Sequence, residues 1–281
     1  MASHVTGGAV DRSIDPAYLA YQYGDAEKLL VRKETHERYS ERPNDLFFDW
    51  VVDQLDPQPG RLVADVGCGP GTYQSRIAER GAVIVGLDLS DGMLRECRTV
   101  ATQHGHGIAL IRADAQALPL ATESCDLLLA AQMLYHVPDR ELALREMRRV
   151  LKPGGRIVLV TGSGDESRYM RLHREIVREL GYEPGDAGGA RFTLNDTALV
   201  ESVFPSAEVR RFENALVFPG PETVLRFYAS GPVDGIRNPS SDGSHRLRLM
   251  AAMEAKLGDV FAREGVLRDP KIYGCFVATK A

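Results

Sequence analysis

Residues 63–72 read Val-Ala-Asp-Val-Gly-Cys-Gly-Pro-Gly-Thr, and this stretch decides the fold. Its apolar beginning belongs to the run LVADV at 62–66, which indicates a buried strand, and a helical pattern follows it. Glycines stand at the alternate positions 67, 69 and 71, where they permit positive φ angles in a tight turn and close approach of a ligand to the backbone. The stretch therefore predicts a strand, a glycine loop that contacts a ligand, and a helix.

Short apolar runs alternate with amphipathic segments over the next hundred residues. The predicted strands are 62–66, 82–88, 108–113, 126–133 and 156–162, and the predicted helices are 71–80, 90–104 and 139–151. The last of these helices stops at Lys-Pro-Gly-Gly, which is a turn signal. Alternation of this kind indicates a parallel sheet with right-handed crossovers and helices on both faces, which is a doubly wound, Rossmann-like α/β fold.

The flanking segments add helices and two more strands, which makes a sheet of seven. The predicted elements are helices at 25–39, 44–56, 166–180, 195–203, 222–229 and 245–263, and strands at 207–218 and 271–280. We expect an N-terminal helical cap at 1–57, a Rossmann-like core at 58–218, a helical insertion or lid at 219–270, and a final core strand at 271–281.

The composition excludes several classes of protein. The chain has 281 residues, 44% of them hydrophobic, and a net charge of −5, which is ordinary for a globular protein and leaves no basic surplus for nucleic acid. No run approaches the roughly 18 apolar residues that a membrane span needs. The four cysteines are widely spaced and predict reduced thiols in a cytoplasmic protein, and no cluster of ligand-type residues predicts a metal.

Two acidic residues follow successive strands after the glycine loop. Asp88 ends the second strand, where a carboxylate can accept hydrogen bonds from both hydroxyls of a ribose, although it could equally cap the next helix. Asp114 follows the third strand, where it can accept from an adenine amino group, with Ala115 as a backbone contact. A glycine loop followed by two such acids predicts a nucleoside site.

The loop departs from the dinucleotide fingerprint G-x-G-x-x-G. The third glycine position of that fingerprint falls on Thr72, and Pro70 removes a backbone N–H that a pyrophosphate would need. Asp65 also places a carboxylate just before the loop. These features favour a ligand without a pyrophosphate and disfavour a nicotinamide-dependent oxidoreductase.

These motifs together resemble class I S-adenosylmethionine-dependent methyltransferases, in the small-molecule branch with ubiquinone- and menaquinone-type motifs. The matching text is DVGCGPG (65–71), LDLS (87–90), RADAQALPL (112–120), CDLLLAAQMLYHVPD (125–139) and RRVLKPGG (148–155), about a third of the chain. The resemblance implies S-adenosyl-L-methionine as the cofactor and a mainly parallel sheet with an antiparallel final strand.

The resemblance also implies a role for each matching position. Gly67, Gly69 and Gly71 would line the methionine part of the cofactor, with Asp65 at its ammonium group and backbone contacts near the sulfonium from Gln132 and Leu134. The ribose would take Asp88, with Leu89 next to it, and the adenine would take Met93 on its face and Asp114 with Ala115 on its edge. We assign Arg32 to the methionine carboxylate, although it could equally be a solvated helix charge.

Candidate catalytic residues are two histidines. His136 directly follows the fourth strand, at the carboxyl edge of the sheet where ligands of open α/β folds bind. His36 shares a helix face with Arg32 and Tyr39, although a surface histidine is the alternative. A base is needed for an alcohol, phenol or carbon acid, whereas a neutral amine can lose its proton to water after transfer.

The sequence thus predicts methyl transfer to nitrogen or oxygen of a small molecule, in secondary-metabolite biosynthesis. A C-methyltransferase acting on an activated carbon or alkene, such as an isoprenoid, is the near alternative. A protein that binds S-adenosylmethionine without methylation, or a cyclase, is the alternative from another class. We expect a small-molecule substrate as the partner, and a homo-oligomer is possible.

Overall fold

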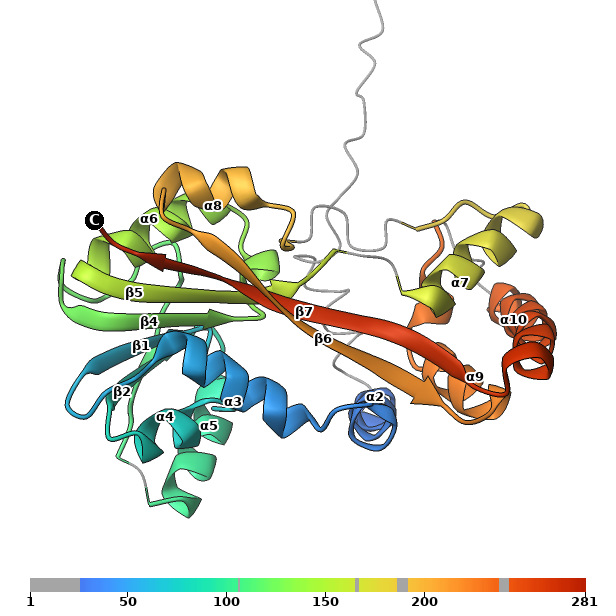
Figure 1. Ribbon diagram of the computed structural model, residues 1–281, viewed down its shortest axis with the longest axis horizontal. Coiled ribbons are helices and arrows are strands. Elements are labelled where there is room, and N and C mark those ends of the chain that lie inside the picture. Colours follow the sequence, from blue (N-terminus) through green and yellow to red (C-terminus); the bar gives the residue numbers. More distant parts are fainter. Residues whose placement is uncertain (1–25, 106, 165–166, 186–191, 238–242) are drawn as a thin grey trace, which may run out of the picture. The chain divides into compact units, whose positions relative to one another are not determined.

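The computed structural model describes residues 26–105, 107–164, 167–185, 192–237 and 243–281 (Figure 1). The chain divides into two compact units. Unit 1 comprises the described residues within 1–39, 167–191 and 217–269, and unit 2 comprises those within 40–166, 192–216 and 270–281. Within the described ranges, no helix is both long and apolar enough to cross a membrane.

Unit 2 is built on a seven-stranded sheet in the order β3-β2-β1-β4-β5-β7-β6, whose last two strands extend into unit 1. The strands from β1 to β5 run parallel to their neighbours, and β7 pairs antiparallel with β5. The strands are β1 (Leu62–Val66), β2 (Val83–Asp88), β3 (Ala109–Arg112), β4 (Cys125–Ala131), β5 (Leu151–Gly162), β6 (Glu208–Phe218) and β7 (Leu267–Thr279). The predicted doubly wound fold with an antiparallel final strand is confirmed.

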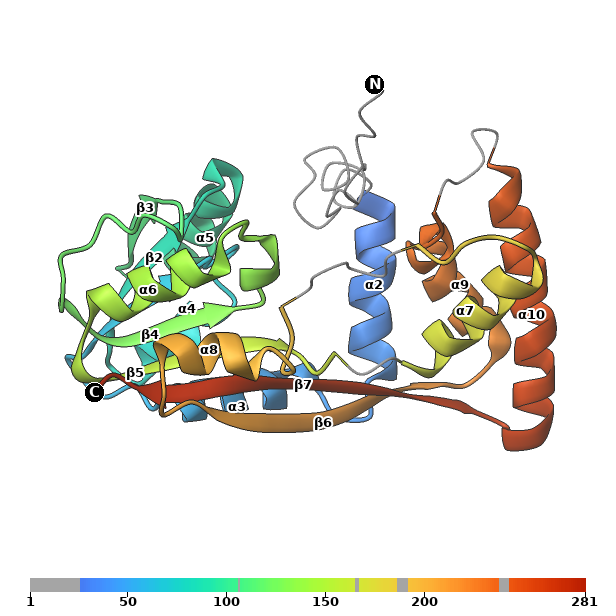
Figure 2. The ribbon, with the colours of Figure 1, turned by 90° about the horizontal axis from the view of Figure 1, so that it is seen from above.

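Both faces of this sheet are covered by helices, as Figures 1 and 2 show. The pleat sends alternate residues of β1 to opposite faces, so Val63 packs in one core cluster and Ala64 in another. Because both clusters are buried, β1 carries apolar residues on both of its faces, and Asp65 is the one polar residue of the strand. The helices of unit 2 are α3 (Asn44–Leu55), α4 (Gln74–Glu79) and α5 (Asp91–Gln103) on one side, and α6 (Arg140–Val150) and α8 (Thr197–Val203) on the other.

Two helices are grouped differently from the division expected above. Helix α3 packs on the sheet in unit 2, where Val51, Val52 and Leu55 are fully buried against strands β1, β4 and β5. Helix α7 (Arg168–Glu179) belongs to unit 1. Helix α3 packs on the sheet because its buried face is apolar and meets the apolar surface of the sheet.

The Lys-Pro-Gly-Gly segment lies inside β5, where only a turn was expected. Leu151 pairs with Cys125, and pairing resumes only when Arg156 meets Leu127, so the intervening residues bulge out of the ladder. Turn and strand are therefore both present.

Unit 1 contains α2 (Ala26–Tyr39), α7, α9 (Pro221–Ala229), the short helix η2 (Pro232–Asp234) and α10 (Ser244–Glu264). Buried polar contacts join these elements. Tyr228 Oη lies 2.6 Å from His173 Nδ1, and His173 Nε2 lies 3.2 Å from the Gly235 carbonyl. Since a carbonyl can only accept, His173 Nε2 is the donor in its bond to Gly235. Arg246 binds the Asp234 carboxylate in the same unit.

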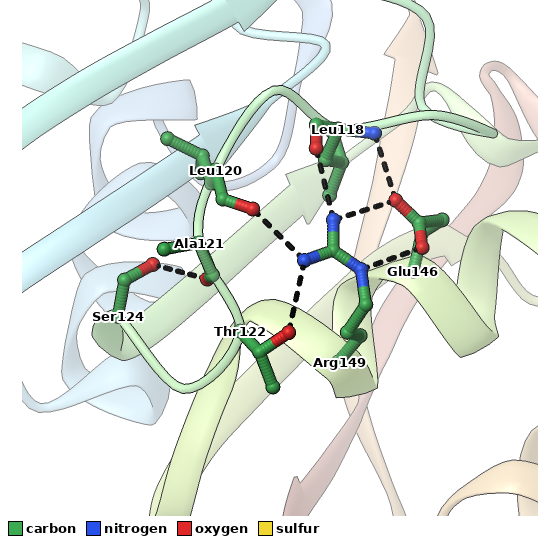
Figure 3. A network of polar contacts seen from close by, with 7 residues as sticks. All are labelled: Leu118, Leu120, Ala121, Thr122, Ser124, Glu146 and Arg149. Carbon is green, nitrogen blue, oxygen red and sulfur yellow. Dashed lines mark hydrogen bonds and ion pairs between the residues drawn. The ribbon is translucent and has the colours of Figure 1, made fainter.

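The side chain of Arg149, on α6, anchors the loop between β3 and β4 (Figure 3). Its Nη1 donates to the Leu120 carbonyl at 2.9 Å and to Thr122 Oγ1 at 3.4 Å, and its Nη2 donates to the Leu118 carbonyl at 2.9 Å. Glu146 accepts from Nε at 2.7 Å and from Nη2 at 2.8 Å, and it also accepts from the Leu118 N–H at 2.9 Å. The five donors of a guanidinium are thus all used.

Replacing Arg149 with Gln should lower the free energy of unfolding by about 2–3 kcal/mol, because the loop carbonyls and the half-buried Glu146 lose a charged donor. Urea denaturation measures this change. The matched control is Arg145→Gln on the same helix. Its ion pair with Glu141 is mostly exposed, so we expect a loss below about 0.5 kcal/mol. Equal losses in the two variants would contradict the anchoring role.

Candidate functional site

The glycine loop between β1 and α4 is tied to the end of β2 by backbone hydrogen bonds. The N–H groups of Gly67 and Cys68 both donate to the Leu87 carbonyl, at 2.7 and 3.0 Å. Gly67, Gly69 and Gly71 have φ angles of +69°, +53° and +89°, in the region where side chains are strained. The predicted tight turn is therefore confirmed, and its conformation requires glycine.

The three glycines differ in what surrounds them. A Cβ atom at Gly67 would come within 2.7 Å of the Met133 side chain, and one at Gly71 would meet Cys97 Sγ at 3.0 Å. A Cβ at Gly69 would have no atom of the described residues within 4 Å. Among these residues, Gly69 is therefore the one of the three loop glycines beside open space.

Asp88, at the end of β2, holds the loop in place with its side chain. Its Oδ2 accepts from the Gly69 N–H at 2.9 Å, and its Oδ1 accepts from the Ser90 N–H at 2.8 Å. The side chain that caps α5 is instead Ser90, whose Oγ accepts from the Met93 N–H. Each carboxylate oxygen can accept a further bond, so Asp88 can receive two hydroxyl donors.

Apolar side chains lie exposed next to this carboxylate. Leu89 is 63% exposed and Met93 is 39% exposed, although both are large hydrophobic residues. Exposed apolar surface beside hydrogen-bonding groups is typical of ligand sites. The pair offers a surface for a flat apolar ring next to the acceptor.

Asp114 and Ala115 follow β3, which is the neighbour of β2 in the sheet. The Ala113 N–H donates to the Asp88 carbonyl at 3.0 Å, so the two strand ends are joined. The Asp114 side chain is exposed and accepts from the backbone and side chain of Gln116, while Ala115 is buried. The two predicted acids therefore follow adjacent strands at the same edge of the sheet.

Gln132, Leu134 and His136 follow β4, on the other side of β1. Gln132 has a φ of +54°, which is unusual for a residue with a side chain, and its N–H donates to the Val160 carbonyl at 2.9 Å. The Leu134 side chain is buried, and its carbonyl accepts from Arg140 Nε at 3.2 Å. The His136 ring packs edge-on against Tyr135, with 4.4 Å between ring centroids. Strained backbone of this kind gathers at functional sites.

Asp65 lies beneath the glycine loop and is only 2% exposed. Gln74 Nε2 donates to its Oδ2 at 3.3 Å, and Cys97 Sγ lies 2.9 Å from Gln74 Oε1. Burial raises the pKa of Asp65 to about 7, although the bond from Gln74 opposes the rise, and the nearby charge of Asp88 adds to it. The sequence analysis did not predict a role for Gln74 or Cys97 in this site. The available signal was Gln74, a polar residue three positions after the third glycine of the loop.

Arg32 and His36 lie in unit 1, whereas the other predicted site residues lie in unit 2. The His36 ring packs edge-on against Phe227, with 5.8 Å between centroids, and Arg32 Nη1 lies 3.8 Å from the Cβ position of Gly231. Both side chains are half-buried. Their roles in binding and catalysis stay predictions.

Among the described residues, no group of three or more His, Cys, Asp or Glu could hold a metal ion. The four cysteines are free thiols, and all are buried.

Residues 64–159 match the family model described as "Methyltransferase domain". The chain is 36% identical over 123 residues to methyltransferase GfsG of Streptomyces halstedii, which covers 41% of this chain and 44% of that protein. It is 34% identical over 144 residues to a ubiquinone biosynthesis O-methyltransferase of Hahella chejuensis, which covers 51% of this chain and 57% of that protein. The chain thus spans about half the length of the curated relatives it matches.

Solved structures share the fold at low sequence identity. The YcgJ protein from Bacillus subtilis superposes with a TM-score of 0.56 at 17% identity, covering 84% of this chain and 98% of that one. The [4+2]-cyclase SpnF gives a TM-score of 0.51 at 18% identity, covering 84% and 82% of the two chains. A Haemonchus contortus N-methyltransferase solved with S-adenosylhomocysteine gives 0.50 at 17%, covering 84% and 52%. The family match indicates S-adenosylmethionine as the cofactor.

Replacing Asp88 with Ala should weaken binding of S-adenosylhomocysteine by at least about 10-fold, or 1.4 kcal/mol, because the ribose loses its acceptor and Gly69 loses its tie. Isothermal titration calorimetry measures the affinity. Asp91→Ala is the control, since this exposed acid near the start of α5 pairs with Arg112. Unchanged affinity in Asp88→Ala would refute the ribose assignment.

Asp65→Asn should stabilise the protein in a pH-dependent way. The folded pKa of about 7 lies above the ordinary value of 3.8, so the native state loses stability as pH rises from about 4 to about 7. The variant's advantage over the natural chain should therefore grow across this window, by at most about 1.4 kcal/mol per pH unit, and then level off. Denaturation at several pH values tests this, with exposed Asp91→Asn as control. If the difference in free energy of unfolding between Asp65→Asn and the natural chain does not vary with pH, the pKa of Asp65 is not raised by burial.

Proposed function

We propose that the protein transfers a methyl group from S-adenosylmethionine to a nitrogen or oxygen of a small molecule, because residues 64–159 match the methyltransferase domain and methyltransferases are among the relatives of the chain. The observation that carries the proposal is the bond from the Gly69 N–H to Asp88 Oδ2. It joins the glycine loop to an acid that keeps acceptor capacity, at an edge with exposed apolar side chains.

The residues present fit the cofactor chemically. Positive φ angles and open space at Gly69 provide a cradle in which backbone can approach the methionine part. Asp88 offers acceptors for two hydroxyls, and Leu89 and Met93 offer an apolar surface for adenine. The bound cofactor supplies a strongly electrophilic methyl group.

The work of the chain's own residues is then positioning and proton removal. Alignment of an acceptor with the methyl group supplies much of the rate of such a displacement. We assign His136 as the base that removes the acceptor's proton, because it follows β4 at the same sheet edge as Asp88. His36 and Arg32 of unit 1 remain proposed as a second base and as the partner of the methionine carboxylate.

A small-molecule acceptor is consistent with the name of the Hahella chejuensis relative, a ubiquinone biosynthesis O-methyltransferase, and with the net charge of −5. A role in secondary metabolism stays a prediction from the sequence. A cytoplasmic location and the oligomeric state stay predictions from the sequence. Methylation on carbon, or a reaction such as cyclisation without methyl transfer, would appear as a different outcome of the experiment that follows.

The test is mass spectrometry after incubation with trideuteromethyl S-adenosylmethionine and a small-molecule extract of the source cells. We expect a labelled product that is lost with Asp88→Ala, and fragmentation should place the label on nitrogen or oxygen. A label on carbon would establish the C-methyltransferase instead. Absence of any labelled product, with cofactor binding shown by calorimetry, would count against methyl transfer.

His136→Asn should lower kcat by about 100-fold or more while cofactor affinity changes little, because a general base contributes about 10²–10⁴ in rate. The control is His104→Asn, an exposed histidine after α5. If kcat stays within a factor of three, His136 is not the base.

A further inference from the structure

Unit 2 contains a cavity that shares no residue with the candidate cofactor site. Its volume is about 450 Å³, and it lies between α6, α8 and the end of the chain. This volume suits a small molecule rather than a macromolecule. The lining residues are Arg145, Arg148, Arg149, Ser202, Val203, Pro205 and Lys280.

The lining is cationic and contains no carboxylate. Arg149 is saturated by the loop contacts described above and contributes mainly its aliphatic stem. Lys280 donates to the Leu151 carbonyl at 2.7 Å and to Glu123 at 3.2 Å, so its ammonium is held in place with one proton to spare. Arg145 uses Nε and Nη2 on Glu141 and keeps Nη1 for another acceptor.

Arg148 is the least neutralised of the four cations. Its guanidinium lies over the Phe204 ring, 5.9 Å from the centroid, and it forms no ion pair within the described ranges. A guanidinium held by an aromatic face keeps its fork of donors for an oxyanion. Apolar surface is present beside it, from buried Val203 and from Pro205.

The cavity lies at the amino ends of the parallel strands, whereas the glycine loop lies at their carboxyl ends. Lys280 follows β7, which runs antiparallel to β5, and it exchanges backbone bonds with Gly154 and Gly155 ahead of the main β5 pairing. The glycine loop and Asp88 instead follow the ends of β1 and β2, which are parallel to β5. A molecule bound in this cavity therefore cannot accept the methyl group of a cofactor that is bound at the glycine loop.

We propose that this cavity is a binding site for a small phosphate monoester. A phosphate dianion matches a site with Arg148, one free edge of Arg145 and the Lys280 ammonium, and the apolar remainder of the ester lies against Val203 and Pro205. The site is separate from the methyl-transfer site and does not depend on its chemistry.

Phenyl phosphate is the probe, because it joins a dianion to an apolar ring. Calorimetry with the full chain should show one saturable site with a Kd below about 1 mM. Saturating S-adenosylhomocysteine should not displace the probe, since the two sites lie at opposite edges. Benzoate, with the same ring and a single charge, should bind more weakly.

Two lining variants and one control test the location. Arg148→Gln and Arg145→Gln should each weaken phenyl phosphate by about 10-fold, because each removes a charged donor. Arg98→Gln, an exposed arginine of α5 outside the cavity, should stay within about two-fold of the natural chain. Unchanged S-adenosylhomocysteine affinity in all three shows that the variants are folded.

Several results would overturn the proposal. These are the absence of a saturable site with a Kd below about 1 mM, competition with S-adenosylhomocysteine, tighter binding of benzoate, or equal effects of Arg148→Gln and Arg98→Gln. The Arg145 variant keeps the test decisive if loss of the Phe204 contact disturbs Arg148→Gln, because Arg145 is largely exposed.

Discussion

The candidate site at the carboxyl ends of the parallel strands depends on the hydrogen bonds between the glycine loop and the end of β2. Gly67 and Cys68 share the Leu87 carbonyl, and Gly69 is bound to the Asp88 side chain. Buried donors must be paired, so the loop cannot move away from β2 without leaving N–H groups unsatisfied. One carboxylate thereby orders the loop and remains available to a ligand.

The glycine loop is supported from below by three buried polar groups. Asp65, Gln74 and Cys97 form a buried polar chain under the loop, and burial disfavours the charge on Asp65. A cationic group arriving near Asp65 would offset that penalty. The cofactor's ammonium is the group that we propose for this position, and its binding there would be coupled to release of a proton from the carboxyl.

Arg149 orders a loop of unit 2 without being one of the candidate site residues. The guanidinium fastens segment 118–122 to α6, and this segment comes shortly after Asp114 and Ala115 in the loop that leaves β3. Its role is to order a loop, while its neighbour Arg148 keeps a free guanidinium over Phe204. Adjacent arginines on one helix thus do different work because their side chains point to different surroundings.

The sequence by itself determined the strand order along the chain, the glycine turn and the two acids, because these depend on local periodicity and on φ angles that glycine adopts. Tertiary structure alone decided that α7 joins unit 1, and that Arg32 and His36 belong to a different unit from Asp88. It also decided that Asp65 is buried against Gln74 and that Arg149 holds a loop almost thirty positions earlier in the chain. The reason is physical: burial and pairing depend on residues that are distant in sequence, and no local pattern records which of them meet.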